Sequence, residues 1–343
     1  MYTKNIIDGH LDIAWGYQSL QRDFLVSARE KSLAETEFIT SVEGIATVGY
    51  PELRQANVSI VCGTIWTESE NSMQPSLGKK YVSIKQAKEL ADDQLSYYVS
   101  LSNHPRLRLV SSTNDINVCL SEASELGIVL LIEGADFIET ESDVQLWFNR
   151  GVRLIAPVWE KNIYGGCSTL GGGLTERGKK LLTVMKKRNM ILDISHMSQL
   201  CANESLSEYS GIVVSSHTSC QTICPGERQA TDEQIIQIHK SGGLVGLMLW
   251  DRILNPGGTG ASLDDFQKHI EHIHRLTGGV DCIAIGSSMD GGFGSLSLPT
   301  GMLNIGDLPK IADWLEKHSN LSPIDIEKIM YRNWERVLRA AFS

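Results

Sequence analysis

Eight short apolar runs recur along the 343-residue chain, and stretches with helix-forming signals separate them. The runs are rich in Ile, Val and Leu and span residues 5–10, 58–65, 127–133, 152–158, 190–195, 211–216, 243–249 and 281–287. Nearly continuous apolar strands are typical of parallel sheets, because helices cover both faces of such sheets. Eight strands alternating with helices predict an α/β fold of the (β/α)8 type, a TIM barrel. A doubly wound open sheet is the alternative fold.

Helix-start signals between the runs support this alternation. Thr231 with Gln234 has the pattern of a capping box, and a related pattern begins at Ser262. The stretch 13–57 is too long for a simple connection between the first two strands, so we expect it to hold small elements of its own. No linker rich in Pro, Gly or Ser divides the chain, which predicts one domain over residues 1–343.

Composition and charge exclude several classes of function. The net charge of −10 argues against nucleic acid as a partner, because nucleic-acid binding needs an excess of Lys and Arg. Because the charge argues against a polyanion, a small-molecule substrate is the expected partner. No apolar run is long enough to cross a membrane. The chain starts without a secretory apolar stretch, and its seven cysteines are scattered without a CxxC pair, which predicts a cytoplasmic location.

Residues with metal-binding side chains end or follow four of the apolar runs. They are His10, Asp12, Glu133, His196 and His217. In a barrel enzyme, the chemistry lies at the carboxyl ends of the strands. His10 and Asp12 are two residues apart, so both side chains project to the same face of an extended segment. Each residue alone is more often structural, whereas their shared location at strand ends predicts a metal site.

The donor types indicate which metal to expect. Imidazole and carboxylate groups without thiolate favour Zn²⁺, and the same donors also bind Mn²⁺ or Fe²⁺. A central Glu133 can bridge two ions. Two ions about 3.5–4 Å apart activate one water together and polarise a carbonyl. The sequence therefore predicts two Zn²⁺ ions and a hydrolytic reaction.

Six motifs resemble, in their order and spacing, those of the membrane dipeptidase family (renal dipeptidase-like, peptidase M19) of the amidohydrolase superfamily. They read DGHLDIAW, LIEGAD, GVRLIAP, ILDISHMS, VVSSHTSC and AIGSSMDGG, and the resemblance spans nearly the whole chain. It implies a binuclear zinc barrel whose five ligands are His10, Asp12, Glu133, His196 and His217, with Glu133 as the bridge. It also implies hydrolysis of dipeptides, often with a D-residue on the C-terminal side. Family members often pair, which leaves a homodimer and a monomer open.

The resemblance also assigns residues to the substrate. Arg228 matches the family arginine that pairs with the terminal carboxylate, and a guanidinium holds a carboxylate through two parallel hydrogen bonds. A solvated arginine before a helix is the alternative. Renal-type members carry a substrate-binding histidine after strand four, whereas this chain has Trp159, as a bacterial subgroup does. Trp159, Tyr164 and Trp66 are candidates to line an apolar pocket, and ordinary core packing is their alternative role.

The end of strand eight departs from the family pattern. The family motif reads Gly-Ser/Thr/Gly-Asp-x-Asp-Gly, whereas residues 286–291 read GSSMDG, so Ser288 replaces the first aspartate. In the superfamily that aspartate takes a proton from the attacking water and passes it to the leaving amine, which a serine hydroxyl does not do unaided. Asp290 projects to the same side about 6–7 Å further along, and it is either a replacement or a turn residue. We predict poor hydrolysis.

Two other readings of the function remain open. The first is a catalytically silent member that binds metal and a ligand without turning the ligand over, which Ser288 favours. The second is a different amidohydrolase, such as a lactonase or phosphotriesterase. Those enzymes usually bridge their metals with a carboxylated lysine after strand four, and this chain offers only Lys161 beyond that strand.

Two further segments have no predicted catalytic residue. The run YGGCSTLGGG lacks the Gly-Lys-Ser/Thr ending of a phosphate-binding loop, so we expect a flexible active-site loop. The segment KHIEHIH places His269 and His272 on neighbouring faces of a predicted helix, and we interpret both as solvated surface residues.

Overall fold

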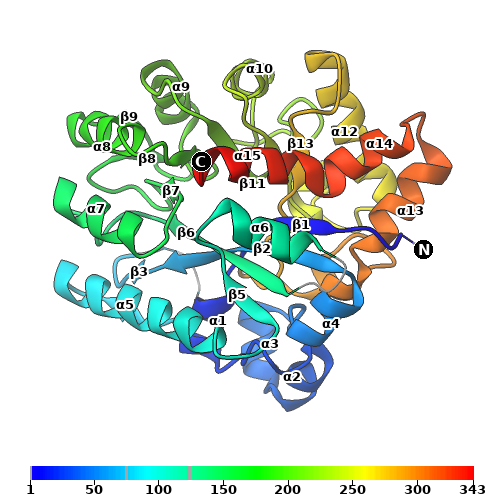
Figure 1. Cartoon of the computed structure of the whole chain (residues 1–343), viewed down its shortest axis with the longest axis horizontal. Helices are drawn as coiled ribbons and strands as arrows, with labels where there is room; N and C mark the ends of the chain where they lie inside the picture. Colours follow the sequence, from blue (N-terminus) through cyan, green and yellow to red (C-terminus); the bar gives the residue numbers. More distant parts are fainter. Residues whose placement is uncertain (1, 74–75, 122–124) are drawn as a thin grey trace.

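The computed structural model describes residues 2–73, 76–121 and 125–343, and its centre is a closed barrel of eight parallel strands (Figure 1). In barrel order the strands are β1 (Ile6–Leu11), β2 (Val58–Trp66), β6 (Leu126–Glu133), β7 (Leu154–Ala156), β10 (Ile191–Asp193), β11 (Val213–Thr218), β12 (Val245–Leu247) and β13 (Ile283–Ile285). The pairing of β13 with β1 closes the ring. Each predicted apolar run overlaps one of these strands, so the barrel is confirmed and the open-sheet alternative is wrong.

Five shorter strands lie outside the ring. Strand β5 (Leu107–Leu109) pairs with the first residues of β6, while β7 pairs with its last residues, so β5 and β7 share one edge of β6. The other four form two small sheets after β2 and β7: β3 (Glu68–Ser69) with β4 (Lys80–Tyr81), and β8 (Gly165–Cys167) with β9 (Gly171–Leu174). These segments follow barrel strands, so they extend the carboxyl-terminal end of the barrel.

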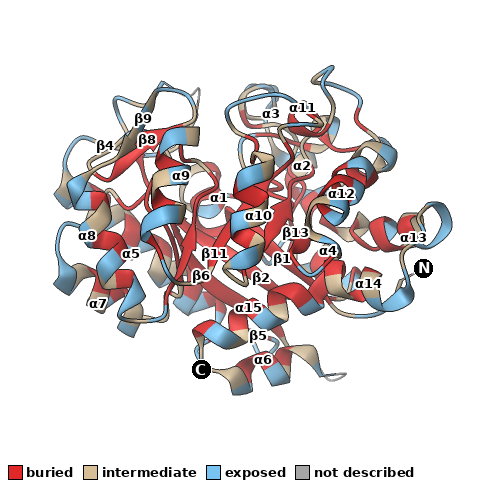
Figure 2. Ribbon diagram, turned by 90° about the horizontal axis from the view of Figure 1, so that it is seen from above, coloured by how far each residue is buried: buried red, intermediate tan, exposed pale blue. Residues whose placement is uncertain are grey.

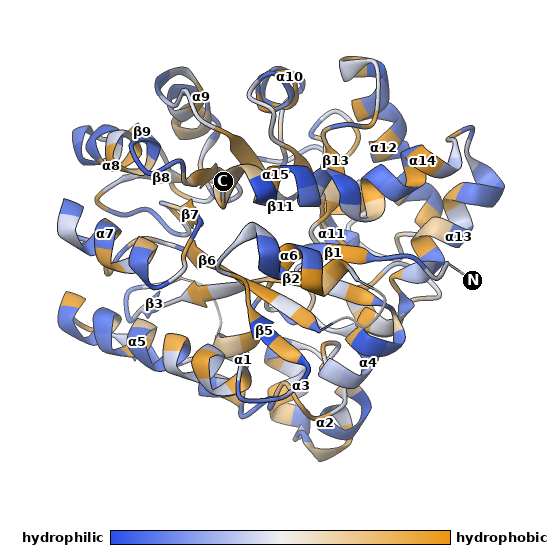
Figure 3. Cartoon of the chain, in the orientation of Figure 1, coloured by the Kyte–Doolittle hydropathy of each residue, from blue (hydrophilic) through white to orange (hydrophobic). Residues whose placement is uncertain are grey.

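Helices form the outer layer, with buried inner faces and exposed, hydrophilic outer faces (Figures 2 and 3). Those that follow β2 along the chain are α5 (Ile84–Leu101), α6 (Thr113–Leu120), α7 (Glu141–Asn149), α8 (Glu176–Lys186), α9 (Gln199–Glu208), α10 (Asp232–Lys240), α11 (Asp251–Leu254), α12 (Leu263–Thr277), α13 (Pro309–His318), α14 (Pro323–Glu327) and α15 (Asn333–Ala341). The capping boxes predicted at Thr231 and Ser262 are confirmed. Within the described residues no helix combines the length and the apolar character that a bilayer crossing requires.

The stretch between β1 and β2 carries four helices: α1 (Ile13–Leu20), α2 (Ala28–Ala34), α3 (Glu37–Glu43) and α4 (Tyr50–Gln55). Arg22 lies between α1 and α2 in the chain and is nearly fully buried. Its guanidinium donates to both carboxylate oxygens of Glu35, at 2.6 and 3.1 Å, and to the carbonyl of Gly44. Arg22, which follows α1, is therefore bound to the end of α2 at Glu35 and to the end of α3 at Gly44. That the whole chain is one domain stays a prediction, as do the cytoplasmic location and the homodimer.

The C-terminal helix α15 lies across one end of the barrel (Figure 1). Its Trp334 is fully buried, and the indole N–H donates to the carbonyl of Ile285 at 2.8 Å. A Cβ atom at Gly9 of β1 would lie 2.1 Å from the indole ring, so only glycine fits at this position. Because α15 covers the amino-terminal end, the carboxyl-terminal end remains for a site.

The interpretation of His269 and His272 as solvated is wrong. His269 is fully buried: its Nδ1 accepts the Cys220 N–H at 3.1 Å, and its Nε2–H donates to the Leu254 carbonyl at 3.0 Å. The Nε2 of His272 lies 2.7 Å from an Asp232 carboxylate oxygen. Helix α12 packs against both α10 and α13, so neighbouring elements cover more of its surface than an isolated amphipathic pattern suggests.

Candidate metal centre

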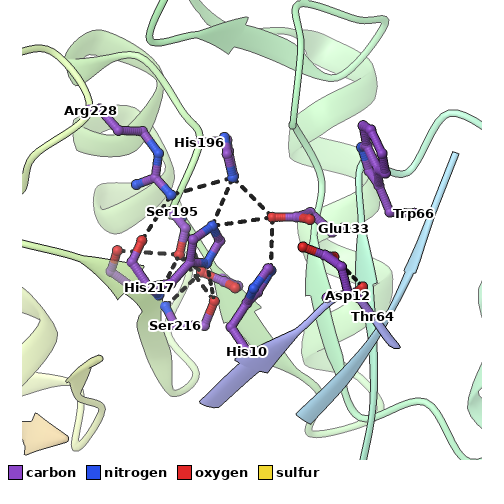
Figure 4. Close-up of polar contacts among 12 residues, drawn as sticks. His10, Asp12, Thr64, Trp66, Glu133, Ser195, His196, Ser216, His217 and Arg228 are labelled. Carbon is purple, nitrogen blue, oxygen red and sulfur yellow. Dashed lines mark hydrogen bonds and ion pairs between the residues drawn. The ribbon is translucent and has the colours of Figure 1, made fainter. Parts of the chain in front are cut away.

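Four histidine and glutamate side chains meet at the carboxyl-terminal end of the barrel (Figure 4). His10 and His217 lie in the last part of β1 and β11, Glu133 is the last residue of β6, and His196 follows β10. His10, Glu133 and His217 are each at most 2 % exposed. Because parallel strands end at the same rim, residues far apart in the sequence come together here.

The distances among these side chains are short. Oxygen Oε1 of Glu133 lies 3.0 Å from Nε2 of His10, 2.9 Å from Nε2 of His196 and 3.4 Å from Nε2 of His217. The Nε2 atoms of His196 and His217 are 2.9 Å apart. The rings of His10 and His217 stack with centroids 3.6 Å apart. One carboxylate oxygen therefore faces three imidazole nitrogens.

Burial and mutual charge shift every ionisable group at this point. Burial opposes the ionisation of Glu133, but His10 and His196 outweigh it and hold the pKa of the carboxyl well below its usual range. Burial also opposes protonation of His10, yet Glu133 and Asp12 raise its pKa to about 9. Burial together with Arg228 lowers the pKa of His196 to about 4. Near neutral pH, His10 is therefore the protonated partner of the Glu133 carboxylate, whereas His196 is neutral.

A divalent cation fits this set of donors. His10, Glu133 and His217 each offer one ligand atom, and these atoms all lie within 4.8 Å of one another. In a tetrahedral site with bonds of 2.0–2.1 Å, neighbouring ligand atoms are about 3.3 Å apart, close to the separations seen here. A cation would also balance the charge of the buried Glu133 carboxylate and accept the lone pairs of the neutral His196 and His217 imidazoles.

Asp12 lies at the edge of this group. It follows β1 directly and precedes α1, and it is 8 % exposed. Burial raises its pKa to about 6. One carboxylate oxygen accepts the hydroxyl of Thr64, and Figure 4 shows the carboxylate beside Glu133. The structure thus brings all five predicted ligand residues to one end of the barrel.

The polar network of Asp193, Ser195 and Ser216, which lies next to His217, was not predicted from the sequence. Asp193 accepts the backbone N–H groups of Ser195 and Ser216 on one carboxylate oxygen, each at 3.0 Å. The hydroxyl of Ser216 lies 2.9 Å from Nδ1 of His217. If Nδ1 carries the proton, Ser216 accepts it and Nε2 is free to bind a cation. The available signal was the change from apolar to polar residues within VVSSHTSC, where Ser215 and Ser216 precede His217.

Arg228 lies against two of the histidines, not in solvent. One guanidinium nitrogen, Nη2, donates to the His217 carbonyl at 2.8 Å and lies 3.3 Å from Nε2 of His196. The other terminal nitrogen, Nη1, is buried and has no hydrogen-bond partner within the described residues. Burial lowers the pKa of Arg228 to about 10. The site therefore contains the guanidinium of Arg228, whose Nη1 still has hydrogen-bond donors to offer.

The aromatic residues proposed as pocket walls separate into two groups. Trp159 lies beside the centre, with its ring 5.9 Å from His196 and 4.6 Å from Trp66. Tyr164 is 4 % exposed within the main hydrophobic core, and its hydroxyl donates to the carbonyl of Ile138. Tyr164 has no free polar atom to offer and packs as core, which is the alternative role that the sequence left open.

The backbone after β13 does not continue as a strand, so the expected shared face of Ser288 and Asp290 is wrong. Both residues adopt left-handed conformations, with φ of 53° and 64°. Asp290 accepts the N–H and hydroxyl of Thr47 at 2.6 and 2.7 Å and the N–H of Val48 at 3.2 Å. Arg22 approaches it at 3.4 Å. Asp290 is thus bound to the segment between β1 and β2.

Ser288 faces the metal-binding end. It is 3 % exposed, and its N–H donates to the carbonyl of His10 at 3.2 Å. A Cβ atom placed on Gly291 would lie 2.8 Å from the Ser288 hydroxyl and 2.9 Å from an Asp12 carboxylate oxygen. The two side chains therefore border the same small space. The glycine-rich run forms the β8–β9 hairpin nearby, where the Ser168 N–H donates to the His196 carbonyl at 3.0 Å.

Comparison with known proteins identifies relatives over the whole chain. The family model described as membrane dipeptidase (peptidase family M19) matches residues 1–342. A protein of Klebsiella pneumoniae, described as an uncharacterized protein in the pqqA 5' region, is 32 % identical over 247 residues, which are 68 % of this chain and 89 % of that protein.

Solved structures share the fold at low sequence identity. A metallopeptidase of Rhodobacter sphaeroides, liganded with a phosphinate mimic of the dipeptide L-Ala-D-Ala, has a TM-score of 0.83 at 18 % identity, over 99 % of this chain and 100 % of that one. A structure described as dipeptidase AC, a metallopeptidase, has a TM-score of 0.82 at 20 % identity, with both chains covered fully.

Proposed function

The chain belongs to the membrane dipeptidase family, peptidase family M19, and on this premise we propose that it is a binuclear zinc hydrolase of dipeptides or related small amides. The observation that carries the proposal is the convergence of Glu133 with His10, His196 and His217, next to the free guanidinium nitrogen of Arg228. The Rhodobacter relative holds a phosphinate mimic of a dipeptide, which supports a dipeptide as the substrate class.

We propose that the five residues His10, Asp12, Glu133, His196 and His217 hold two metal ions, with Glu133 between them. Bound there, the ions would supply Lewis acidity for the scissile carbonyl and for the attacking water. Glu133 is suited to the central position because it is held as a carboxylate and one of its oxygens already faces three imidazoles. Zn²⁺ suits this set of donors best.

Arg228 orients the substrate in this proposal. Its Nη2 is occupied by the His217 carbonyl, whereas Nη1 is buried without a partner in the described part of the chain. A substrate carboxylate would satisfy this donor and balance the buried charge. Trp159 stands where renal-type members have a histidine, and it offers an apolar ring, not an imidazole donor, next to His196.

Proton transfer is the weak step of the proposed reaction. Ser288 cannot take a proton from water at neutral pH, and both oxygens of Asp290 already accept hydrogen bonds from Thr47 and Val48. We therefore propose that hydrolysis is slow and that Asp290 is not its proton acceptor. A metal- and ligand-binding protein without turnover is the second candidate function, and Ser288 is the observation that favours it.

The test combines metal analysis with kinetics on L,L- and L,D-dipeptides, using this chain and Ser288→Asp. Aspartate tolerates the left-handed backbone at this position, so the variant is expected to fold. We expect two equivalents of divalent metal in both proteins and hydrolysis faster by roughly 10²–10⁴-fold in Ser288→Asp. Equal activity in the two proteins would refute the role of position 288. Bound metal without activity in either protein would favour the silent binder.

A further inference from the structure

Three tryptophans pack against one another next to the metal centre, and we call this group the indole cluster: Trp15, Trp66 and Trp159. The rings of Trp15 and Trp66 are 5.2 Å apart and those of Trp66 and Trp159 are 4.6 Å apart. Leu20 and Leu77 pack against the same cluster. Trp15 and Trp66 are 3 % and 6 % exposed, whereas Trp159 is half-buried. Trp159 is therefore the part of the cluster most open to a ligand.

The cluster touches the centre at two points. Trp66 is the β2 residue that pairs with Glu133 of β6, so the two residues lie side by side at the rim. The ring of Trp159 is 5.9 Å from that of His196. In Figure 4, Trp66 lies on the side of Asp12, and Arg228 lies on the side of His196, with Glu133 between them. The centre thus has a cationic end at Arg228 and an aromatic end at Trp66, and Trp159 extends the aromatic end toward His196.

These two ends fix the direction of a bound dipeptide. If Arg228 holds the C-terminal carboxylate, the scissile carbonyl lies over the metal centre and the N-terminal residue lies beyond it, on the side of the indoles. We propose that the indole cluster is the subsite for the N-terminal side chain and that the enzyme prefers dipeptides whose N-terminal residue is large and apolar. This inference rests on the proposed function, because Arg228 sets the direction of the substrate.

The physical reason for the preference is burial of apolar surface. A leucine side chain placed against indole faces loses contact with water and gains dispersion contacts, whereas glycine offers no side chain to bury. A carboxylate side chain would lose its hydration against this surface and find no positive partner in the cluster. Discrimination between side chains that differ by a few methylene groups is commonly 10–200-fold, and we expect roughly 10–100-fold in kcat/KM between Leu-Ala and Gly-Ala.

The kinetic test uses the metal-loaded Ser288→Asp protein, so that turnover is measurable, with Gly-Ala, Ala-Ala and Leu-Ala as substrates. In Trp159→Ala, the ratio of kcat/KM between Leu-Ala and Gly-Ala should fall to below about 3-fold. In Trp66→Phe, the same ratio should fall by an intermediate amount. Trp314→Phe is the matched control, because Trp314 is a half-buried indole of α13 outside the cluster, and the ratio should persist.

Two kinetic outcomes would overturn the inference. A ratio near one in the parent protein would mean that the side chain is not recognised. A loss by the same factor for all three dipeptides in Trp159→Ala would mean that the indoles hold a group common to all substrates, such as the ammonium group over a ring face. Either result leaves the proposed hydrolysis of dipeptides intact.

A binding measurement separates failure of the inference from failure of the proposed function. Phosphinate analogues of Leu-Ala and Gly-Ala are titrated calorimetrically into the metal-loaded protein, and tryptophan fluorescence is recorded in parallel. Tighter binding of the Leu-Ala analogue, with a fluorescence change that Trp159→Ala abolishes, supports the subsite even if no dipeptide is hydrolysed. Equal affinity for the two analogues overturns the subsite. Absence of both hydrolysis and binding overturns the subsite together with the proposed function.

Discussion

Ser216 illustrates how one side chain next to the site can set the state of a ligand residue. Its hydroxyl lies 2.9 Å from Nδ1 of His217, and its N–H is held by Asp193 at 3.0 Å. With the Nδ1 proton engaged by Ser216, Nε2 of His217 presents a lone pair to the centre. Ser216 is therefore a positioning residue in the proposed metal site.

Removing the Ser216 hydroxyl should lower the affinity for metal more than it lowers the stability of the fold. We expect Ser216→Ala to lower the affinity for Zn²⁺ by roughly 10–100-fold, the usual effect of losing a partner of a ligating histidine. Competition with a chromophoric chelator measures it. Ser215→Ala is the control, because Ser215 is equally buried and its hydroxyl contacts Ser195, not an imidazole. Affinities that are equal in the two variants would contradict the role of Ser216.

His269 provides a pH-dependent term in stability that is independent of the metal centre. Burial lowers its pKa from 6.5 to about 4, and both ring nitrogens are used in hydrogen bonds. Between these pH values the unfolded chain binds more protons than the folded protein, so the free energy of unfolding falls as the pH falls. From pH 7 to pH 5 this single group should account for a loss of about 2 kcal/mol.

The variant His269→Gln isolates that term. In urea unfolding at pH 7 and pH 5, the wild-type protein should lose about 2 kcal/mol more than His269→Gln on acidification. His318→Gln serves as control, since His318 lies on the exposed side of α13 and its removal should leave the wild-type pH dependence in place. Parallel losses in wild-type and His269→Gln would show that His269 does not titrate in this range.

At the scale of elements, Asp290 joins the loop after β13 to the segment between β1 and β2. It accepts three hydrogen bonds from Thr47 and Val48 and lies 3.4 Å from the buried guanidinium of Arg22. Two glycines also meet at this junction, because a Cβ on Gly44 would lie 2.1 Å from the backbone of Gly294. The polar bonds and the close backbone packing hold the four helices α1–α4 next to the site.

Loss of this carboxylate should therefore destabilise the protein. We expect Asp290→Ala to cost roughly 2–4 kcal/mol, because it leaves the buried N–H groups of Thr47 and Val48 without their acceptor and removes a negative charge beside the buried Arg22 guanidinium. Urea unfolding measures the total, and hydrogen exchange at the Thr47 and Val48 amides measures the local loss. Asp307→Ala, which removes a half-buried turn carboxylate, should cost less than about 1 kcal/mol. If the Thr47 and Val48 amides were as protected from hydrogen exchange in Asp290→Ala as in the wild-type protein, Asp290 would not hold this junction.

At the scale of the whole molecule, the proposed ligands tie together four parts of the ring, β1, β6, β11 and the turn after β10. A metal bound by all of them stabilises the closed barrel relative to the unfolded chain. Ligand concentrations of 100 to 1,000 times Kd correspond to about 2.7–4.1 kcal/mol. Removing divalent ions with a chelator should therefore lower Tm by several degrees, and adding Zn²⁺ back should restore it.

A variant that lacks one of the proposed metal ligands is the control for the chelation experiment. In His217→Ala the Tm should respond weakly to chelator and to Zn²⁺, because one of the three mutually close ligand residues is missing. In His318→Gln the full response should remain. A wild-type Tm that does not change with chelator, in protein shown by metal analysis to have lost its ions, would exclude a structural contribution of the metal.

The amino-acid sequence by itself determined the barrel and the positions of the candidate ligands. Burial on both faces makes barrel strands continuously apolar, so the eight runs were readable, and the residues that end those runs must lie at one rim. The motifs likewise indicated the family that the whole-chain match identifies. These features are local in the chain, or follow from the symmetry of a closed parallel sheet.

Only the tertiary structure decided what each polar side chain does. Asp290 turns from the site to Thr47 because its backbone is left-handed, which no periodicity indicates. His269 is buried against Cys220 and Leu254, which lie far from it in the sequence, and Tyr164 lies in the main core with its hydroxyl on the carbonyl of Ile138. The bond from the Ser216 N–H to Asp193 and the indole cluster likewise depend on contacts between residues far apart in the chain. Such contacts are set by the packing of whole elements, which single-residue patterns do not encode.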